Sequence, residues 1–256
     1  MIHDASTESW NSLGSEWISL AQEEDSTRMV FIMPYMLELM GDVKGKSILD
    51  LGCGEGGYSR ELTKKGAKVT AVDCNGVAVN YGIEAANEES LSVRCLLRNS
   101  NDLCGLSANE FDIVLCSMML MDCEDLAGTV REAFRVLKPS GKMYVSVLHP
   151  CFNGNYSLGI GRQGEGIDRE VVVKNYFEPK EWEAPLNKGT IPVLWHHRTL
   201  EDYVKVFISS GFTINDLREP RPTDEQANIS VPIAWLRKIP LFLYLTLRKR
   251  SFGTDI

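Results

Sequence analysis

The sequence has no long apolar run. Its longest, at residues 239–247, is far shorter than the roughly 20 apolar residues that a membrane-spanning helix needs. The N-terminal residues also lack the basic segment followed by an apolar core that is typical of a secretory signal. We therefore expect a soluble, cytoplasmic protein without a membrane partner.

Positive charge is also scarce. The 256 residues include 27 lysines and arginines against 35 acidic residues, which gives a formal net charge of −8. The dense basic cluster at 248–250 is interpreted as a solvated strand end. Because nucleic-acid binding usually requires a basic surface, we expect no nucleic-acid partner.

Paired cysteine motifs are missing. No two cysteines have C-x-x-C spacing, and none has a spacing to histidine that suits zinc. The odd number of cysteines, and their places in or beside apolar runs, predict reduced thiols that are mostly buried, and no metal site. The seven are Cys53, Cys74, Cys95, Cys104, Cys116, Cys123 and Cys151.

Residues 46–148 alternate between apolar runs rich in β-branched residues and helical stretches, the pattern of a parallel sheet covered on both faces. The fold class is therefore α/β, with a Rossmann-like doubly wound sheet that binds its ligands at the carboxyl ends of the strands. Strands are predicted at 46–51, 67–72, 93–98, 111–116 and 142–148, and helices at 57–65, 76–89 and 124–137.

Two regions depart from this alternation. Residues 1–45 are predicted to form an N-terminal helical cap, in which Pro34 starts or kinks a helix. Residues 46–256 are predicted to form the ligand-binding domain, with an insertion at about 149–196 that has little periodicity and is interpreted as a lid. The expected later elements are a helix at 199–210 and strands at 212–218 and 241–247, with the order of 224–238 left open.

A glycine-rich loop follows the first predicted strand. Gly52, Gly54 and Gly57 have the G-x-G-x-x-G spacing of a loop whose backbone approaches a ligand closely. Asp73 ends the second strand about 20 residues later, where a carboxylate can accept hydrogen bonds from both ribose hydroxyls. Both features suit an adenosine-type ligand, but neither feature distinguishes one such ligand from another.

Several motifs in order resemble those of the class I S-adenosylmethionine-dependent methyltransferases: residues 48–54, Asp73, residues 111–114 and residues 135–141. The resemblance covers residues 29–148 well and extends more loosely to 220. It implies a seven-stranded, mainly parallel sheet whose last strand is antiparallel. It also implies S-adenosylmethionine as the cofactor and S-adenosylhomocysteine as the product.

The acid at position 50 agrees with this resemblance. Asp50 precedes the first glycine, where it would repel the pyrophosphate of a dinucleotide. The methionine end of S-adenosylmethionine instead carries an ammonium beside a sulfonium. Asp50 can favour that end either by direct contact or by ordering the loop.

The resemblance also implies which residues hold the cofactor. The loop lines the methionine moiety through its backbone, and Asp73 holds the ribose. A side chain after the third strand fixes the adenine amino group, with the choice among three residues left open. The full implied set is Asp50, Gly52, Cys53, Gly54, Asp73, Cys74, Asn99, Ser100, Asn101, Cys116 and Trp17.

A catalytic base is optional, because positioning in a dry pocket supplies much of the rate of methyl transfer. His149, after the fifth strand, is one candidate base, and a turn that merely ends the strand is its alternative interpretation. His197, at the end of the insertion, is a second candidate. Asp122, Glu124 and Asp125 are interpreted as a helix start, so no metal is implied.

We therefore expect an S-adenosylmethionine-dependent methyltransferase that acts on an O, N or C nucleophile of a small molecule, as a monomer or homodimer. Aromatic residues in the insertion, with Trp10 and Trp17, suit an apolar or ring-bearing acceptor. Two alternatives stay open: a non-catalytic S-adenosylmethionine-binding regulatory module, and a nicotinamide-dependent Rossmann oxidoreductase.

Overall fold

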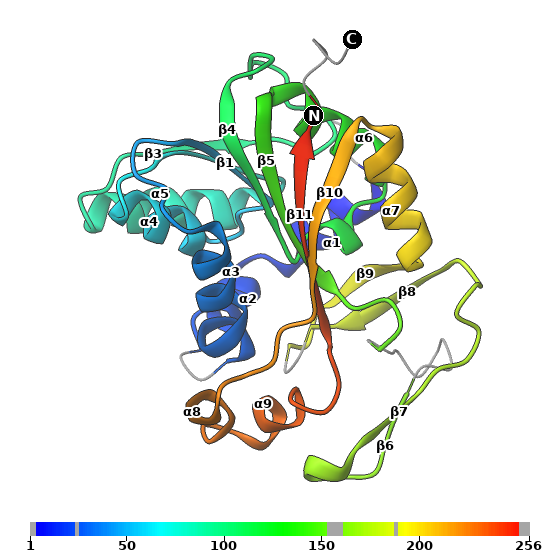
Figure 1. The fold of residues 1–256 in the computed structure, drawn as a ribbon. Helices are drawn as coiled ribbons and strands as arrows, with labels where there is room; N and C mark the ends of the chain where they lie inside the picture. Colours follow the sequence, from blue (N-terminus) through cyan, green and yellow to red (C-terminus); the bar gives the residue numbers. More distant parts are fainter. Residues whose placement is uncertain (1–3, 24–25, 153–160, 187–188, 251–256) are drawn as a thin grey trace.

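One seven-stranded sheet forms the centre of the molecule (Figure 1). The computed structural model describes residues 4–23, 26–152, 161–186 and 189–250. The strand order is β10-β11-β5-β4-β1-β2-β3, and β11 runs antiparallel to both of its neighbours while the other pairings are parallel. The strands are β1 Ser47–Leu51, β2 Lys68–Asp73, β3 Val93–Leu97, β4 Phe111–Ser117, β5 Leu137–Leu148, β10 Phe212–Arg218 and β11 Phe242–Lys249.

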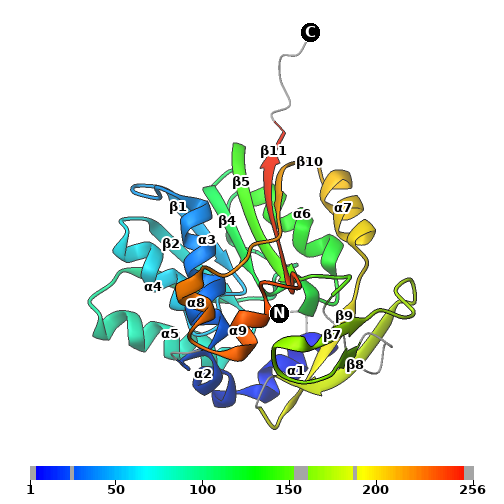
Figure 2. The same ribbon diagram turned by 60° about the horizontal axis from the view of Figure 1, so that its bottom comes forward.

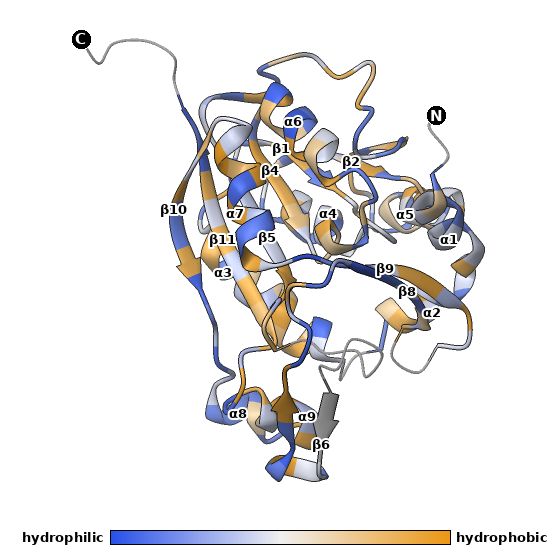
Figure 3. Cartoon of the chain, turned by 90° about the vertical axis from the view of Figure 1, so that its right-hand side faces the viewer, coloured by the Kyte–Doolittle hydropathy of each residue, from blue (hydrophilic) through white to orange (hydrophobic). Residues whose placement is uncertain are grey.

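Helices cover both faces of this sheet. One side carries α3 (Met33–Met40), α4 (Gly57–Lys64) and α5 (Gly76–Glu88), and the other carries α6 (Leu126–Val136) and α7 (Leu200–Ser209) (Figure 2). A separate buried apolar cluster lies under each layer. Strands covered on both faces are apolar on both faces, which gives the continuous apolar runs in the sequence and the orange central strands of Figure 3.

Segments from three parts of the chain gather at the carboxyl ends of the parallel strands (Figure 1). They are the N-terminal helices, two hairpins from the insertion, and short helices between β10 and β11. Of these segments, the helix at residues 5–13 packs against the hairpin strand at residues 192–197. These elements are α1 Ala5–Leu13, α2 Ser15–Ala21, β6 Gly161–Gln163, β7 Glu170–Val172, β8 Lys180–Pro185, β9 Pro192–His197, α8 Asp224–Ala227 and α9 Val231–Trp235, with single turns η1 Arg28–Ile32, η2 Leu120–Asp122 and η4 Gly166–Asp168.

The predicted fold class is confirmed, including the antiparallel last strand. Pro34 lies in the first turn of α3, so the prediction that it starts a helix is also confirmed. β5 begins earlier than predicted. Leu137 pairs with Phe111, and after a register shift the pairing resumes between Lys142 and Ile113. The turn residues between these pairs therefore lie inside the strand, as an irregularity.

The interpretation of the basic cluster as a solvated strand end is wrong for Lys249. This residue ends β11, and only 9% of it is exposed. Its Nζ donates hydrogen bonds to Asn109 Oδ1 and to the carbonyl oxygens of Phe134 and Leu137, at 3.0, 2.7 and 2.6 Å. These acceptors offset the cost of burying an ammonium group, and they come from segments more than a hundred residues away.

Candidate active site

The carboxyl ends of the parallel strands open into a cavity of about 900 Å³. Strand ends supply its floor, and four tryptophans from the covering segments line it as well. A crevice at this edge of a doubly wound sheet is the usual ligand site of such folds, and this one is large enough for two small ligands. The residues that represent each wall are Gly52, Asp73, Asn99, Ser117 and Leu148 from the strand ends, and Trp10, Trp17, Trp195 and Trp235 from the cover.

The glycine loop presents bare backbone to this cavity. Gly52 and Gly54 have φ angles of 76° and 55°, which are left-handed and favour glycine. A Cβ at Gly52 would lie 2.7 Å from Met119 Cβ, and one at Gly54 would lie 2.6 Å from Trp17 Nε1. The turn thus requires glycine for its backbone conformation and for the side chains that close over it.

Asp73 connects this loop to the end of β2. Its Oδ2 accepts a hydrogen bond from the Gly54 backbone N–H at 2.7 Å, and its Oδ1 accepts one from the Asn75 N–H at 2.8 Å. Burial raises the pKa of the Asp73 carboxyl, and the backbone hydrogen bonds oppose that effect. Asp73 is also one of the residues that line the cavity, and a carboxylate has further lone pairs that can accept hydrogen bonds from a ligand.

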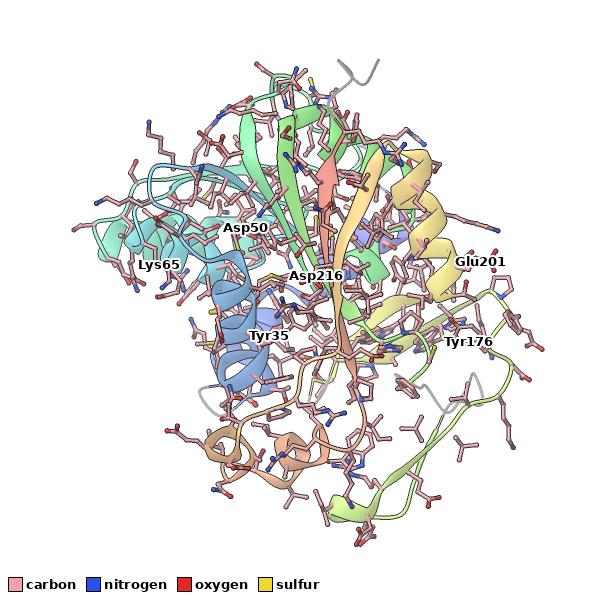
Figure 4. The ribbon with its side chains drawn as sticks, viewed as in Figure 1. Tyr35, Asp50, Lys65, Tyr176, Glu201 and Asp216 are labelled. Atoms are coloured by element: carbon pink, nitrogen blue, oxygen red, sulfur yellow. The ribbon has the colours of Figure 1, made fainter. Side chains whose placement is uncertain are left out.

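Asp50 lies under the loop and is not among the described residues that line the cavity. Only 1% of it is exposed, and it accepts a hydrogen bond from Ser59 Oγ at 2.6 Å. Burial raises its pKa to about 7. Because Ser59 belongs to α4, this bond ties together the two elements that flank the loop, which favours the loop-ordering alternative. Asp50 itself belongs to β1, and Figure 4 labels its position.

A carboxylate already lies at the start of α4. Glu55 is 2% exposed, and a Cβ at Gly57, the first residue of the helix, would lie 2.5 Å from Glu55 Oε1. Arg28 forms an ion pair with Glu55 at 2.9 Å and donates a hydrogen bond to the Ala21 carbonyl. Arg28 also lines the cavity, a role that no sequence motif predicted.

The candidates after the third strand separate into two groups. Asn99 and Ser100 line the cavity, while Asn101 does not. The Asn99 amide nitrogen donates hydrogen bonds to Thr7 Oγ1 at 2.7 Å and Asp4 Oδ2 at 3.2 Å, so it holds α1 in place. The Asn99 amide can therefore contact a ligand only while it also keeps its hydrogen bonds to Thr7 and Asp4.

The remaining cofactor candidates also separate. Cys53 and Cys74 line the cavity, as does Trp17, which packs edge to face on Trp10 with ring centroids 5.7 Å apart. Cys116 is fully buried within β4 and is not among the lining residues of the described chain. The three residues that follow it do line the cavity.

Neither candidate histidine is among the described residues that line the cavity. His149 is bonded to Glu219 Oε1 at 2.9 Å, and burial lowers its pKa. His197 Nε2 is bonded to the backbone oxygen of Tyr176 at 2.8 Å. Figure 4 shows Tyr176 on the insertion, below α7. Both histidines thus contact the covering segments.

Asp122 is a cavity residue that the sequence analysis interpreted differently. The helix start is Asp125, whose side chain caps α6 by accepting a hydrogen bond from the Gly128 N–H at 2.7 Å. Asp122 lies before it in η2 and lines the cavity. In the sequence, only the position shortly after β4 marks Asp122 as a site residue. Glu124 and Asp125 have nearly the same position, so the sequence does not single out Asp122. No group of three or more metal-binding side chains occurs in the described residues.

Comparisons with known proteins agree with this geometry. A family model described as a methyltransferase domain matches residues 49–145. The chain is 34% identical over 108 residues to a ubiquinone biosynthesis O-methyltransferase of Xanthomonas oryzae pv. oryzae. That match covers 42% of this chain and 45% of the relative, so it spans less than half the length of that protein.

Solved structures extend the similarity to nearly the whole chain. An S-adenosylmethionine-dependent methyltransferase from Mesorhizobium loti is 26% identical, with a TM-score of 0.71 over 88% of this chain and 98% of that one. A Burkholderia thailandensis 1,6-didemethyltoxoflavin-N1-methyltransferase with bound S-adenosylhomocysteine shares the fold, at 16% identity and a TM-score of 0.61 over 98% of this chain and 92% of that one. Together, these similarities support a class I S-adenosylmethionine-dependent methyltransferase.

Proposed function

We propose that the protein is an S-adenosylmethionine-dependent methyltransferase that methylates a small molecule and releases S-adenosylhomocysteine. The observation that carries this proposal is the bare glycine backbone beside Asp73, in one large cavity at the strand ends. The similarity to S-adenosylmethionine-dependent methyltransferases supports the same reaction. When bound, S-adenosylmethionine supplies an electrophilic methyl group on a sulfonium.

The residues present fit this cofactor. Gly52 and Gly54 both line the cavity, and Met119 and Trp17 pack where a Cβ would lie, so the loop brings its backbone rather than side chains to the cavity wall. Asp73 offers acceptor atoms for the ribose hydroxyls. Arg28 brings a positive charge to the cavity wall that suits the methionine carboxylate.

The same residues do not fit a dinucleotide. A pyrophosphate in a Rossmann fold is held at the N-terminus of the helix after the glycine loop. Here the Glu55 carboxylate already lies against Gly57 at that terminus, paired with Arg28. A second anion there would meet like charge, which argues against the nicotinamide-dependent alternative.

The proposed cofactor contacts follow from the cavity lining. In the proposed complex Gly52, Cys53 and Gly54 would contact the methionine moiety, Asp73 and Cys74 the ribose, and Asn99 and Ser100 the adenine. All seven residues line the cavity. Trp17 covers the loop. Asp50, Asn101 and Cys116 do not line the cavity in the described chain. We propose that they stabilise the loops and the strand that carry the contact residues.

The chain's own part in the reaction is to position the acceptor and to exclude water. Tryptophans from α1, α2, β9 and α9 line the cavity opposite the strand ends. A dry, shaped site holds an acceptor in line with the methyl group and so supplies much of the rate. His149 and His197 lie outside this lining, and the proposal gives neither a proton-transfer step.

We propose that the acceptor is a small molecule and that the protein binds no nucleic acid. We also propose that it acts in the cytoplasm, as a monomer or homodimer. The net charge of −8 supports the absence of a nucleic-acid partner. No helix in the described part of the chain is long and apolar enough to cross a membrane.

The test is methyl transfer from radiolabelled S-adenosylmethionine to fractions of a metabolite extract, after titration with S-adenosylhomocysteine. We expect saturable binding and a labelled small-molecule product. Binding without transfer to any fraction would favour the regulatory module instead. Binding of a nicotinamide dinucleotide in place of S-adenosylhomocysteine would favour the oxidoreductase.

A further inference from the structure

Asp122 is a buried acid whose hydrogen-bonding capacity is incomplete. It lies in η2, just after β4, and only 7% of it is exposed. Its Oδ1 is buried and has no hydrogen-bond partner among the described residues, and Asp122 is one of the residues that line the cavity. An unpaired carboxyl oxygen in a protein interior costs free energy unless a ligand group completes it.

The nearby cation does not complete it. Arg198 donates hydrogen bonds to the carbonyl oxygens of Leu120 and Met121, at 3.1 and 3.3 Å, and to those of the next two residues after Asp122. Its guanidinium therefore fixes the backbone around Asp122, and no donor of the described residues pairs with the Asp122 Oδ1. The other titratable groups that interact with Asp122 are Tyr203 and Cys123, both buried.

The cavity wall around Asp122 combines apolar side chains with two further acids, Glu124 and Asp125. Met118, Met119 and Met121 line the cavity from the same loop. β9, which carries the cavity-lining Trp195, packs against η2. A ligand at this wall meets thioethers and an indole ring. Glu124 and Asp125 accept hydrogen bonds from the backbone N–H groups of Ala5 and Gly128, whereas the Asp122 Oδ1 has no partner among the described residues.

We propose that Asp122 recognises the acceptor and takes its proton, and that the acceptor is an apolar, ring-bearing small molecule with an O–H or N–H nucleophile. This inference rests on the proposed function. The nucleophile's lone pair forms the bond to the methyl carbon, and the methyl–sulfur bond breaks with its electron pair left on sulfur. The O–H or N–H proton passes to the Asp122 carboxylate and then to water.

The chemistry of the site suits this role. Burial, partly offset by Arg198, raises the pKa of the Asp122 carboxyl well above its ordinary value. A carboxylate with a raised pKa is a stronger base than an exposed one, and burial beside the acceptor aligns it for the transfer.

The test uses phenol and its methyl ether anisole as probes, titrated into the protein saturated with S-adenosylhomocysteine. The two differ in the O–H that Asp122 would accept. One hydrogen bond to a buried carboxyl predicts that wild type binds phenol about fivefold or more tighter than anisole. Asp122→Asn should reduce this preference to less than about twofold, because an amide is a weaker acceptor than a carboxylate.

Asp102→Asn is the matched control, since Asp102 follows β3 but is not a cavity-lining residue of the described chain, and it should keep the wild-type preference. Equal affinities of wild type for the two probes would overturn the inference, and this comparison needs no variant. A preference retained in Asp122→Asn would also overturn it. Failure of S-adenosylhomocysteine to bind would instead contradict the proposed function itself.

Discussion

At the scale of single residues, the site depends on a few side chains whose roles come from contacts across the fold. Asp73 is the clearest, because one carboxylate holds the glycine loop by the Gly54 N–H and also lines the cavity. The acid was visible in the sequence from its place after an apolar strand. Its bond to the loop depends on β1 and β2 lying side by side.

Asp73→Asn should weaken S-adenosylhomocysteine binding by roughly 10- to 100-fold, because hydrogen bonds to a charged acceptor contribute about 1.5–3 kcal/mol. Isothermal titration calorimetry measures the change, with Asp102→Asn as the control on a neighbouring strand end. An Asp73→Asn protein that folds and binds as tightly as wild type would contradict the ribose assignment.

Gly54→Ala tests the close approach at the loop. The new Cβ would collide with Trp17, and alanine is strained at the left-handed φ of 55° that this position has. We expect strain and displacement of roughly 1.4 kcal/mol, which correspond to about a tenfold loss of S-adenosylhomocysteine affinity. Gly45→Ala is the matched control, because Gly45 also has a left-handed φ, of 74°, but no atom within 4 Å of an added Cβ. Similar affinities for both variants would show that the Trp17 contact does not matter.

At the scale of elements, the sequence predicted the core better than its cover. The strands and helices between 46 and 148 are long and periodic, and each occurs near its predicted place. The short helices α8 and α9 have too few residues for a period to show, although Thr223 and Ser230 cap them. Arg28 and Asp122 were missed as site residues because their positions depend on how distant elements pack.

The cover is held in part by Glu16 of α2. Its carboxylate accepts hydrogen bonds from the Thr190 N–H and hydroxyl, at 2.6 and 2.7 Å, and from the Ile191 N–H at 3.1 Å. Glu16→Ala should therefore raise amide hydrogen exchange in α2 and in the segment before β9. Mass spectrometry measures the exchange.

Glu8→Ala is the control for this change, because Glu8 is exposed on α1. S-adenosylhomocysteine should restore part of the lost protection, since Trp17 of α2 and Trp195 of β9 both line the cavity in which the ligand would bind. Unchanged exchange in Glu16→Ala would show that these bonds do not hold the cover.

At the scale of the whole molecule, stability should depend on pH through Asp50. Its pKa is raised from 3.8 to about 7, so the folded state holds this proton more tightly than the unfolded state. The stability that protonated Asp50 contributes is complete below about pH 4 and is lost as the pH rises through 7. The largest loss this allows is about 4 kcal/mol.

Asp50→Asn removes this titration. The melting temperature of Asp50→Asn minus that of wild type should therefore be larger at pH 8 than at pH 5, by several degrees. Thermal unfolding at both pH values measures the difference, with the exposed Asp42→Asn as a control. A melting-temperature difference between Asp50→Asn and wild type that is the same at both pH values would contradict the assigned pKa.

The central claim is that the cavity at the strand ends binds the adenosyl cofactor of the family. Calorimetric titration of the wild-type protein with S-adenosylhomocysteine, and separately with NAD⁺, tests it most directly. We expect saturable one-to-one binding of S-adenosylhomocysteine and no heat from NAD⁺. No binding of S-adenosylhomocysteine, or NAD⁺ binding that S-adenosylhomocysteine displaces, would contradict it.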